Sequence, residues 1–131
     1  MSDFPLNVTA AAAVILGAMY IFMTFQIGLQ RGKERIAMGD NGDPVLAKKI
    51  RGHANAAEQI PLGLILIGLN EAMNSAPTAM VLAALLVLGR IAHAIHFFGE
   101  KKPLVFRAGG MMLTILSHLL GVIGLALGLI L

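Results

Sequence analysis

Residues 51–61 read RGHANAAEQIP, and the apolar run LGLILIGL follows at once. A helix with 3.6 residues per turn places Arg51, Asn55 and Glu58 on one narrow face, with His53 nearly opposite. A cation, an amide and a carboxylate thus share one face of a helix that leads into an apolar segment. Because ionisable groups inside a membrane are costly, they are candidates for function.

The composition is that of a membrane protein. Of the 131 residues, 57% are hydrophobic and 13% are charged, whereas a soluble domain has about 45–50% and about 25%. The length predicts one compact domain, residues 1–131. The chain has no cysteine, which excludes a disulfide, a cysteine-ligated metal and a protein thiol nucleophile. Nucleic-acid binding needs a solvated basic face, for which the polar surface is too small.

Four long helices are predicted, at about residues 5–38, 44–74, 77–98 and 104–131. Residues 4–30 carry no charge, and about 20 apolar residues are enough to cross a bilayer. Gly39 predicts the end of the first helix, and Asp43 followed by Pro44 predicts the start of the second. The second helix can cross only if its polar first half packs inside a bundle, and Pro61 predicts a kink or an unbonded carbonyl there.

Short connections between the four helices predict an all-α, up-down-up-down four-helix bundle in the membrane. Nine of the ten Lys and Arg residues lie within residues 31–51 and 101–107, at the first and third connections. The positive-inside rule places these connections in the cytoplasm and both termini on the non-cytoplasmic side. Lysines at this level can reach lipid phosphates. Glycines at 124 and 128 would permit a close helix contact.

Arg90, His93 and Phe97 share a face of the third helix. Arg90 lies in the middle of a span and therefore needs a carboxylate partner, for which Glu58 and Glu71 are the candidates within the membrane. The spacing fits a structural ion pair between the second and third helices, and it also fits a ligand site. The same two interpretations apply to the polar face of the second helix.

Arg107 falls in the first turn of the fourth helix. A guanidinium beside the N–H groups of a helix start favours an anion, although a solvated arginine at the membrane interface fits the same position. His93 and His96 are too weakly supported by neighbouring carboxylates to predict a metal or haem site. His118 is predicted to pack inside the bundle with a hydrogen bond.

Two motifs, in order and on the expected spans, resemble those of the MAPEG family, membrane proteins of eicosanoid and glutathione metabolism. One is R-x-H-x-N-x-x-E-x-x-P at residues 51–61. The other is G-R-x-x-H-x-x-x-F at residues 89–97, followed by a basic residue that opens the fourth helix. The resemblance covers nearly the whole chain and is closest to small bacterial members. It implies a homotrimer, in a bacterial inner membrane, that binds glutathione between adjacent subunits.

By the same resemblance, the protein is a glutathione-dependent transferase or peroxidase that attacks hydrophobic electrophiles or lipid hydroperoxides. Arg107 would be the catalytic residue that stabilises the glutathione thiolate. Glutathione would be held by Arg31, Arg51, His53, Asn55, Glu58, Arg90, His93 and Phe97. Arg31 and His53 match positions that serve the neighbouring subunit's site. Better-known members often carry tyrosine at the Phe97 position, so the alternative is a non-catalytic ligand-binding or scaffold protein of the same fold.

Overall fold

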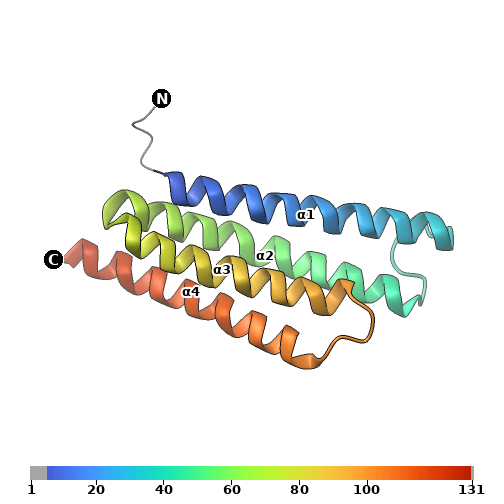
Figure 1. Cartoon of the computed structure of the whole chain (residues 1–131). Coiled ribbons are helices and arrows are strands. Elements are labelled where there is room, and N and C mark those ends of the chain that lie inside the picture. Colours follow the sequence, from blue (N-terminus) through green and yellow to red (C-terminus); the bar gives the residue numbers. More distant parts are fainter. Residues whose placement is uncertain (1–5, 131) are drawn as a thin grey trace.

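In the computed structural model, which describes residues 6–130, the chain folds into four long α-helices. They are α1 (Asn7–Glu34), α2 (Pro44–Met73), α3 (Ala76–Phe98) and α4 (Leu104–Ile130). The helices run up and down side by side, so that the start of α1 and the end of α4 lie at the same end of the bundle (Figure 1). This arrangement confirms the predicted all-α bundle.

The starts of α2, α3 and α4 lie within one residue of their predicted positions, and side chains cap the first two, from Asp43 and Ser75. Asp43 Oδ1 accepts from the N–H of Val45 at 3.0 Å, and Pro44 is the first residue of α2. The second oxygen of Asp43 accepts from Gln30 Nε2 at 3.0 Å, a hydrogen bond that holds the pKa of this carboxyl below its usual value. The helix boundaries predicted at residues 5 and 131 lie outside the described residues.

The predicted end of the first helix at residue 38 is wrong, because α1 ends at Glu34. Arg35 has a left-handed backbone with φ of 54°, and the N–H of Ile36 donates to the Arg31 carbonyl at 2.9 Å. This pattern is a Schellman-type helix end, a position that usually requires glycine. Ile36 is buried, and burying this side chain turns the backbone before Gly39 is reached.

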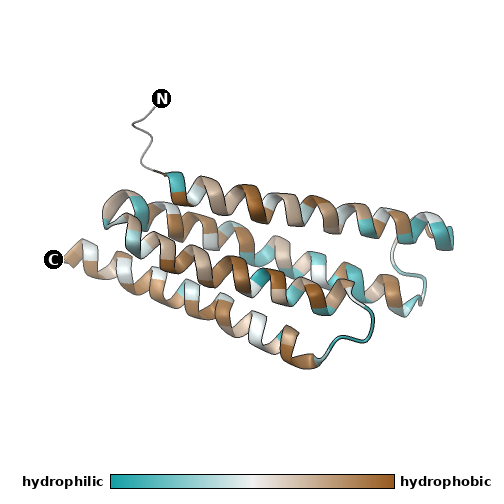
Figure 2. Ribbon diagram, viewed as in Figure 1, coloured by the Kyte–Doolittle hydropathy of each residue, from teal (hydrophilic) through white to brown (hydrophobic). Residues whose placement is uncertain are grey.

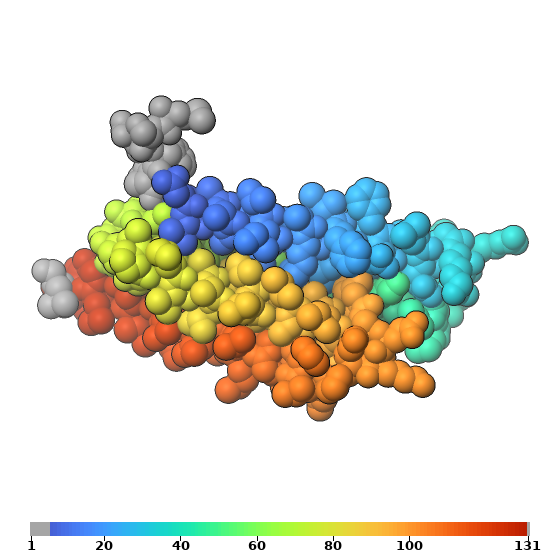
Figure 3. All heavy atoms as spheres, in the orientation of Figure 1, coloured from blue at the N-terminus to red at the C-terminus, as the bar shows by residue number. Residues whose placement is uncertain are grey.

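The two inner helices of the bundle are α2 and α3. Each contacts the three other helices, whereas α1 and α4 do not touch within residues 6–130. Figure 3 shows α1 and α4 on opposite sides of α3. The core contains small and aliphatic side chains from the first three helices, among them Leu16, Ala56, Ile67 and Leu86. Pro61 lies inside α2 without interrupting it.

The outer surface of the bundle is apolar. Phe25 on α1 is 68% exposed and Leu129 on α4 is 75% exposed, and Figure 2 shows hydrophobic residues along most of every helix. Three helices, α1, α3 and α4, are long and apolar enough to cross a membrane. The more polar α2 has 30 residues, about 45 Å of helix, and packs among the others. The chain is therefore an integral membrane bundle.

Glycines let α4 approach α3 closely. A Cβ atom on Gly89 would lie 2.7 Å from the carbonyl oxygen of Gly110, and one on Gly110 would lie 2.6 Å from the carbonyl oxygen of Gly89. Gly109, by contrast, faces open space. The two backbones therefore touch at this crossing, which lies one turn from Arg107 on α4.

At the other end of the bundle, two asparagines hold α4: Asn70 in the last turn of α2 and Asn74, the residue that follows α2. Asn70 Nδ2 donates to the carbonyl of Gly121 at 3.0 Å, and Asn74 Nδ2 donates to that of Gly124 at 3.1 Å. Side chains at Gly124 or Gly128 would collide with the amide oxygens of these asparagines. The close contact predicted from the two glycines is confirmed, and its partner is a pair of amides.

The first turn of α1 is capped by a residue of α2. The carboxylate of Glu71 accepts from the N–H groups of Val8 and Thr9, both at 2.8 Å, and from the Thr9 hydroxyl at 2.7 Å. The first N–H groups of a helix have no partner within that helix, and a negative charge there is favoured by the helix dipole. Glu71 therefore anchors the start of α1.

Candidate functional site

A cavity of about 410 Å³ opens where α2, α3 and the first turns of α4 meet. It brings together three of the predicted site residues: Asn55 from α2, His93 from α3 and Arg107 from α4. The other lining residues are Leu104, Ala108 and Met111. Together with Arg107 they recur at the three- and four-residue spacing of a single helix face. That spacing could have identified them from the sequence.

An aromatic side chain supports the cavity wall. The ring of Phe97 is buried and stacks on His93 with 4.7 Å between ring centroids, and the Arg107 guanidinium carbon lies 5.7 Å from the Phe97 centroid. A guanidinium over an aromatic face is held by a cation–π attraction. Gly52 lets α2 approach Phe97 so closely that a Cβ atom there would overlap the ring. Phe97 thus packs against both His93 and Arg107 through its ring, without the hydrogen bond that a tyrosine hydroxyl could make.

Arg90 is buried directly behind Asn55. It is 1% exposed, and its Nη1 donates to Asn55 Oδ1 at 2.8 Å. Its Nε and Nη2 atoms have no hydrogen-bond partner among residues 6–130. These two groups form one edge of the guanidinium, the edge that can hold a carboxylate through two parallel hydrogen bonds. Since buried donors are nearly always paired, this edge is suited to an anionic ligand group.

Neither of the two predicted carboxylates, Glu58 and Glu71, forms an ion pair with Arg90 within residues 6–130. Glu71 is engaged by the start of α1, and Glu58 is exposed. The single salt bridge within residues 6–130 joins the exposed Lys33 and Glu34 at 3.9 Å. For Glu71 the reason is distance, because it lies sixteen residues beyond Asn55, about 24 Å along the helix. Glu58 is one turn from Asn55, but its side chain is exposed whereas Arg90 is buried. The structural ion pair expected between α2 and α3 is therefore wrong.

The remaining predicted residues do not line the cavity. Arg51 and Glu58 are exposed on α2, and Arg31 is half-buried in the last turn of α1. His53 lies on the side of α2 that faces α1, as the helical spacing predicts. Its ring stacks on Tyr20 with 4.3 Å between centroids, and its Nε2 lies 3.0 Å from the hydroxyl oxygen of Thr24.

The histidines of the chain are placed separately. His96 Nδ1 lies 3.2 Å from the Pro103 carbonyl oxygen, and His118 Nε2 is buried against Gly63 without a hydrogen-bond partner among the described residues. Within residues 6–130, no three His, Asp or Glu side chains gather in a way that could hold a metal ion. The polar groups that line the cavity are therefore the Arg107 guanidinium, the Asn55 amide and the His93 imidazole, and the Arg90 guanidinium lies buried behind Asn55.

Comparisons with known proteins agree with this architecture. The sequence profile of the MAPEG family matches residues 9–127. The inner membrane protein YecN of Escherichia coli strain K12 is 34% identical over 119 residues, which make up 88% of this chain and 88% of YecN. YecN of E. coli O6:H1, strain CFT073, matches to the same extent. Because the family match runs through all four helices, the chain belongs to the MAPEG family.

Proposed function

We propose that this protein is a membrane-bound, glutathione-dependent transferase or peroxidase that acts on hydrophobic electrophiles or lipid hydroperoxides. The observation that carries the proposal is the buried edge of the Arg90 guanidinium, which has no hydrogen-bond partner among residues 6–130 and lies behind a cavity that Arg107 lines. Two guanidiniums without carboxylate partners suit a small molecule that carries anionic groups. Membership of a family associated with glutathione metabolism makes glutathione the first candidate.

The chemistry of glutathione matches the groups around the cavity. Glutathione carries two carboxylates, which arginine can bind through its planar fork. It also carries an ammonium, for which the exposed carboxylate of Glu58, one turn from Asn55, is a suitable partner. Its thiol has a pKa of about 8.5, and the guanidinium of Arg107 would lower that pKa by favouring the thiolate.

The thiolate would then attack in one of two ways. In a transfer reaction, sulfur forms a bond to an electrophilic carbon, and the leaving group departs with the bonding electrons. In peroxide reduction, sulfur takes the terminal oxygen, the O–O bond breaks and an alcohol is released after protonation. A second glutathione then forms a disulfide with the oxidised one, and water leaves. Both reactions need the ionised thiol, which assigns the catalytic role to Arg107.

We also propose a homotrimer with glutathione bound between adjacent subunits. What supports it is the exposure of Glu58, midway along α2, a helix that lies within the membrane bundle. A charged side chain at the centre of a membrane helix costs about 2.5–3.5 kcal/mol on insertion scales. A neighbouring subunit or a bound zwitterion would remove that cost. In this arrangement Arg31 and His53 serve the neighbour's site.

The proposed location is the inner membrane of a bacterium, as the name of YecN states for that protein. Basic residues gather at the α1–α2 and α3–α4 connections, and the positive-inside rule supports a cytoplasmic position for that end of the bundle. Both termini would then lie on the non-cytoplasmic side. Glutathione would enter the cavity from the cytoplasmic end, and an electrophile soluble in lipid would enter from the bilayer.

The test is to add glutathione to the purified full-length protein, measure thiolate absorbance and measure binding by calorimetry. The wild type and the Lys33→Ala control, which removes an exposed cation outside the cavity, should bind glutathione and show thiolate. Arg107→Ala should retain binding but lose the thiolate signal. Binding without thiolate in the wild type would favour the non-catalytic ligand-binding alternative. No binding at all would refute the proposed function.

A further inference from the structure

A second groove, of about 500 Å³, lies between α1 and α3. Its walls are apolar and include Phe22 of α1, which is 55% exposed, and Ile91, Ile95 and Phe98 of α3. At one end the groove reaches Gly99 and Lys102, where α3 gives way to the third connection. The groove thus begins at the level of the connections and runs along the bundle toward the middle of the spans.

A lysine is held across the mouth of this groove. A Cβ atom on Gly99 would lie 2.7 Å from Cγ and 2.9 Å from Cε of Lys102. The lysine stem therefore lies over the end of α3, in space that only glycine leaves open. Lys48 of α2 adds a second charge at this point, because its Nζ donates to the Gly99 carbonyl at 3.3 Å.

These two ammonium groups have no carboxylate partner within residues 6–130. The only salt bridge there joins two residues at the end of α1, so even the nearby Glu100 is not paired with either lysine. The groove therefore combines an apolar channel with an unneutralised positive end.

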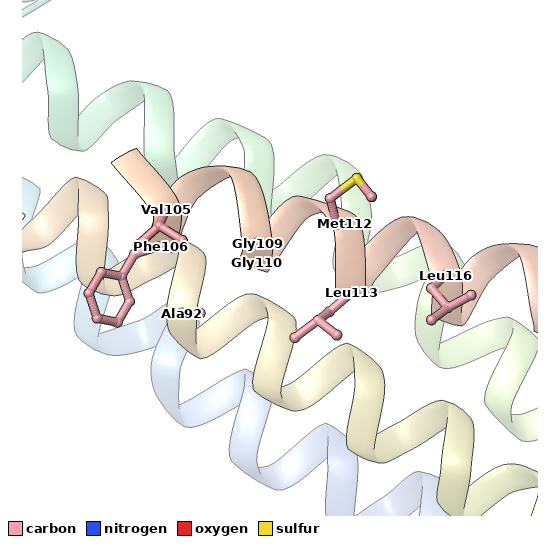
Figure 4. A pocket seen from close by; sticks show the side chains of 8 residues that line it. All are labelled: Ala92, Val105, Phe106, Gly109, Gly110, Met112, Leu113 and Leu116. Carbon is pink, nitrogen blue, oxygen red and sulfur yellow. The ribbon is translucent and has the colours of Figure 1, made fainter. Parts of the chain in front are cut away.

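Two other apolar grooves among residues 6–130 lack this positive end. The groove between α3 and α4, of about 580 Å³, is lined by Val105, Phe106, Leu116 and other uncharged residues (Figure 4). A groove of about 450 Å³ near the start of α1 also has no cation in its lining. Apolar grooves alone are expected wherever helices meet lipid. The lysines distinguish the one between α1 and α3.

We propose that the α1–α3 groove binds one anionic phospholipid, with an acyl chain along the groove and its phosphate against Lys102 and Lys48. The groove volume falls within the range of about 300–1,000 Å³ that is typical of ligand sites. From Ile91 to Phe98 it follows about 10 Å of helix, enough for the upper part of one acyl chain. A net negative headgroup is favoured because each basic residue near the membrane surface attracts anionic lipid by about 1 kcal/mol. This lipid site does not depend on glutathione binding.

The absence of tryptophan from the chain makes a contact assay possible. Phe22→Trp would place one fluorescent reporter in the α1–α3 groove, and Leu116→Trp would place one in the uncharged α3–α4 groove. The full-length variants are reconstituted in vesicles that contain phosphatidylglycerol or phosphatidylcholine with brominated acyl chains, which quench tryptophan on contact. Ile95→Trp provides a second reporter in the same groove if Phe22→Trp does not fold.

We expect brominated phosphatidylglycerol to quench the groove reporter at a mole fraction at least fivefold lower than brominated phosphatidylcholine. Lys102→Gln and Lys48→Gln should each reduce this preference about fivefold, the factor that corresponds to about 1 kcal/mol per basic residue near a membrane surface. Lys101→Gln, whose lysine does not line the groove, should leave the preference unchanged. Equal quenching by both lipids at the groove reporter, the same preference at position 116, or a preference that survives Lys102→Gln would each overturn the proposal.

Discussion

Replacing Arg90 with methionine distinguishes a structural role for this guanidinium from a ligand-binding one. Arg90 is 1% exposed and makes one described hydrogen bond, to Asn55. If it held α2 and α3 together, its removal would weaken the fold. If it is kept for a ligand, the fold without ligand should tolerate or even benefit from its removal, because methionine fills a similar volume with a flexible apolar chain.

The magnitudes favour a stabilised variant. Arg90→Met loses one hydrogen bond to a charged group, about 1.5–3 kcal/mol, but removes two buried donors without partners, each costing about 1–3 kcal/mol. It also removes a buried charge, and replacing buried ionic groups by apolar ones often stabilises a protein by about 1–4 kcal/mol. We therefore expect the free energy of unfolding without glutathione to rise by about 1–3 kcal/mol.

Glutathione binding should change in the opposite direction. Losing one member of a buried charge pair costs about 2–5 kcal/mol of binding free energy, which corresponds to a Kd about 30-fold higher or more.

Unfolding is followed by circular dichroism as sodium dodecyl sulfate is added to protein in mild detergent, and binding is followed by calorimetry. Arg51→Met, at an exposed arginine of α2, is the stability control and should lie within about 0.5 kcal/mol of the wild type. A loss of about 3 kcal/mol or more in Arg90→Met would show a structural role, and unchanged glutathione affinity would remove Arg90 from the site.

Two further predictions concern the packing of the bundle. Gly110→Ala should lower the free energy of unfolding by about 1–3 kcal/mol, because its Cβ atom would meet the backbone of α3. Gly109→Ala, the control, should raise the free energy of unfolding by up to about 1 kcal/mol. Equal effects of the two substitutions in the same unfolding assay would contradict the close contact of α3 and α4 at Gly89 and Gly110. Glu71→Gln puts an amide N–H group against the N–H groups of the first turn of α1, so the Thr9 amide hydrogen should exchange about tenfold faster or more. Glu58→Gln, which removes the same charge from the exposed face of α2, should leave that exchange rate unaltered.

The parts of the fold that could be predicted are those that local sequence specifies. Asp43 and Pro44 form a helix start through atoms within two residues of each other, so the start of α2 was predictable. The end of α1 was not, because the burial of Ile36 just after the helix follows from the folded structure and not from a local sequence signal. Gly39 does adopt a positive φ of 66°, but in the connection rather than at the helix end.

The candidate site, like the fold, was predictable only where a pattern within one helix indicates which residues share a face. Helical spacing together with the family motifs pointed to Asn55, His93 and Arg107, which do line one cavity. The partner of Arg90 could not be found this way, because the choice between an amide of α2 and a carboxylate depends on the relative heights of helices in the bundle. Nor does any local pattern show that Glu71 caps a helix whose first turn lies 62 residues away in sequence.

The amides of Asn70 and Asn74 have a consequence at the far end of the bundle. Asn55 lies fifteen residues before Asn70 on α2, and Arg107 lies fourteen residues before Gly121 on α4, so the two intervals measure about 21–23 Å of helix. A slip of α4 by one residue would replace the glycines under the amides with leucine or isoleucine, which leave no room for them. The asparagines therefore fix the position of α4 along the bundle axis. In doing so they keep the Arg107 guanidinium at the same level of the bundle as the Asn55 amide.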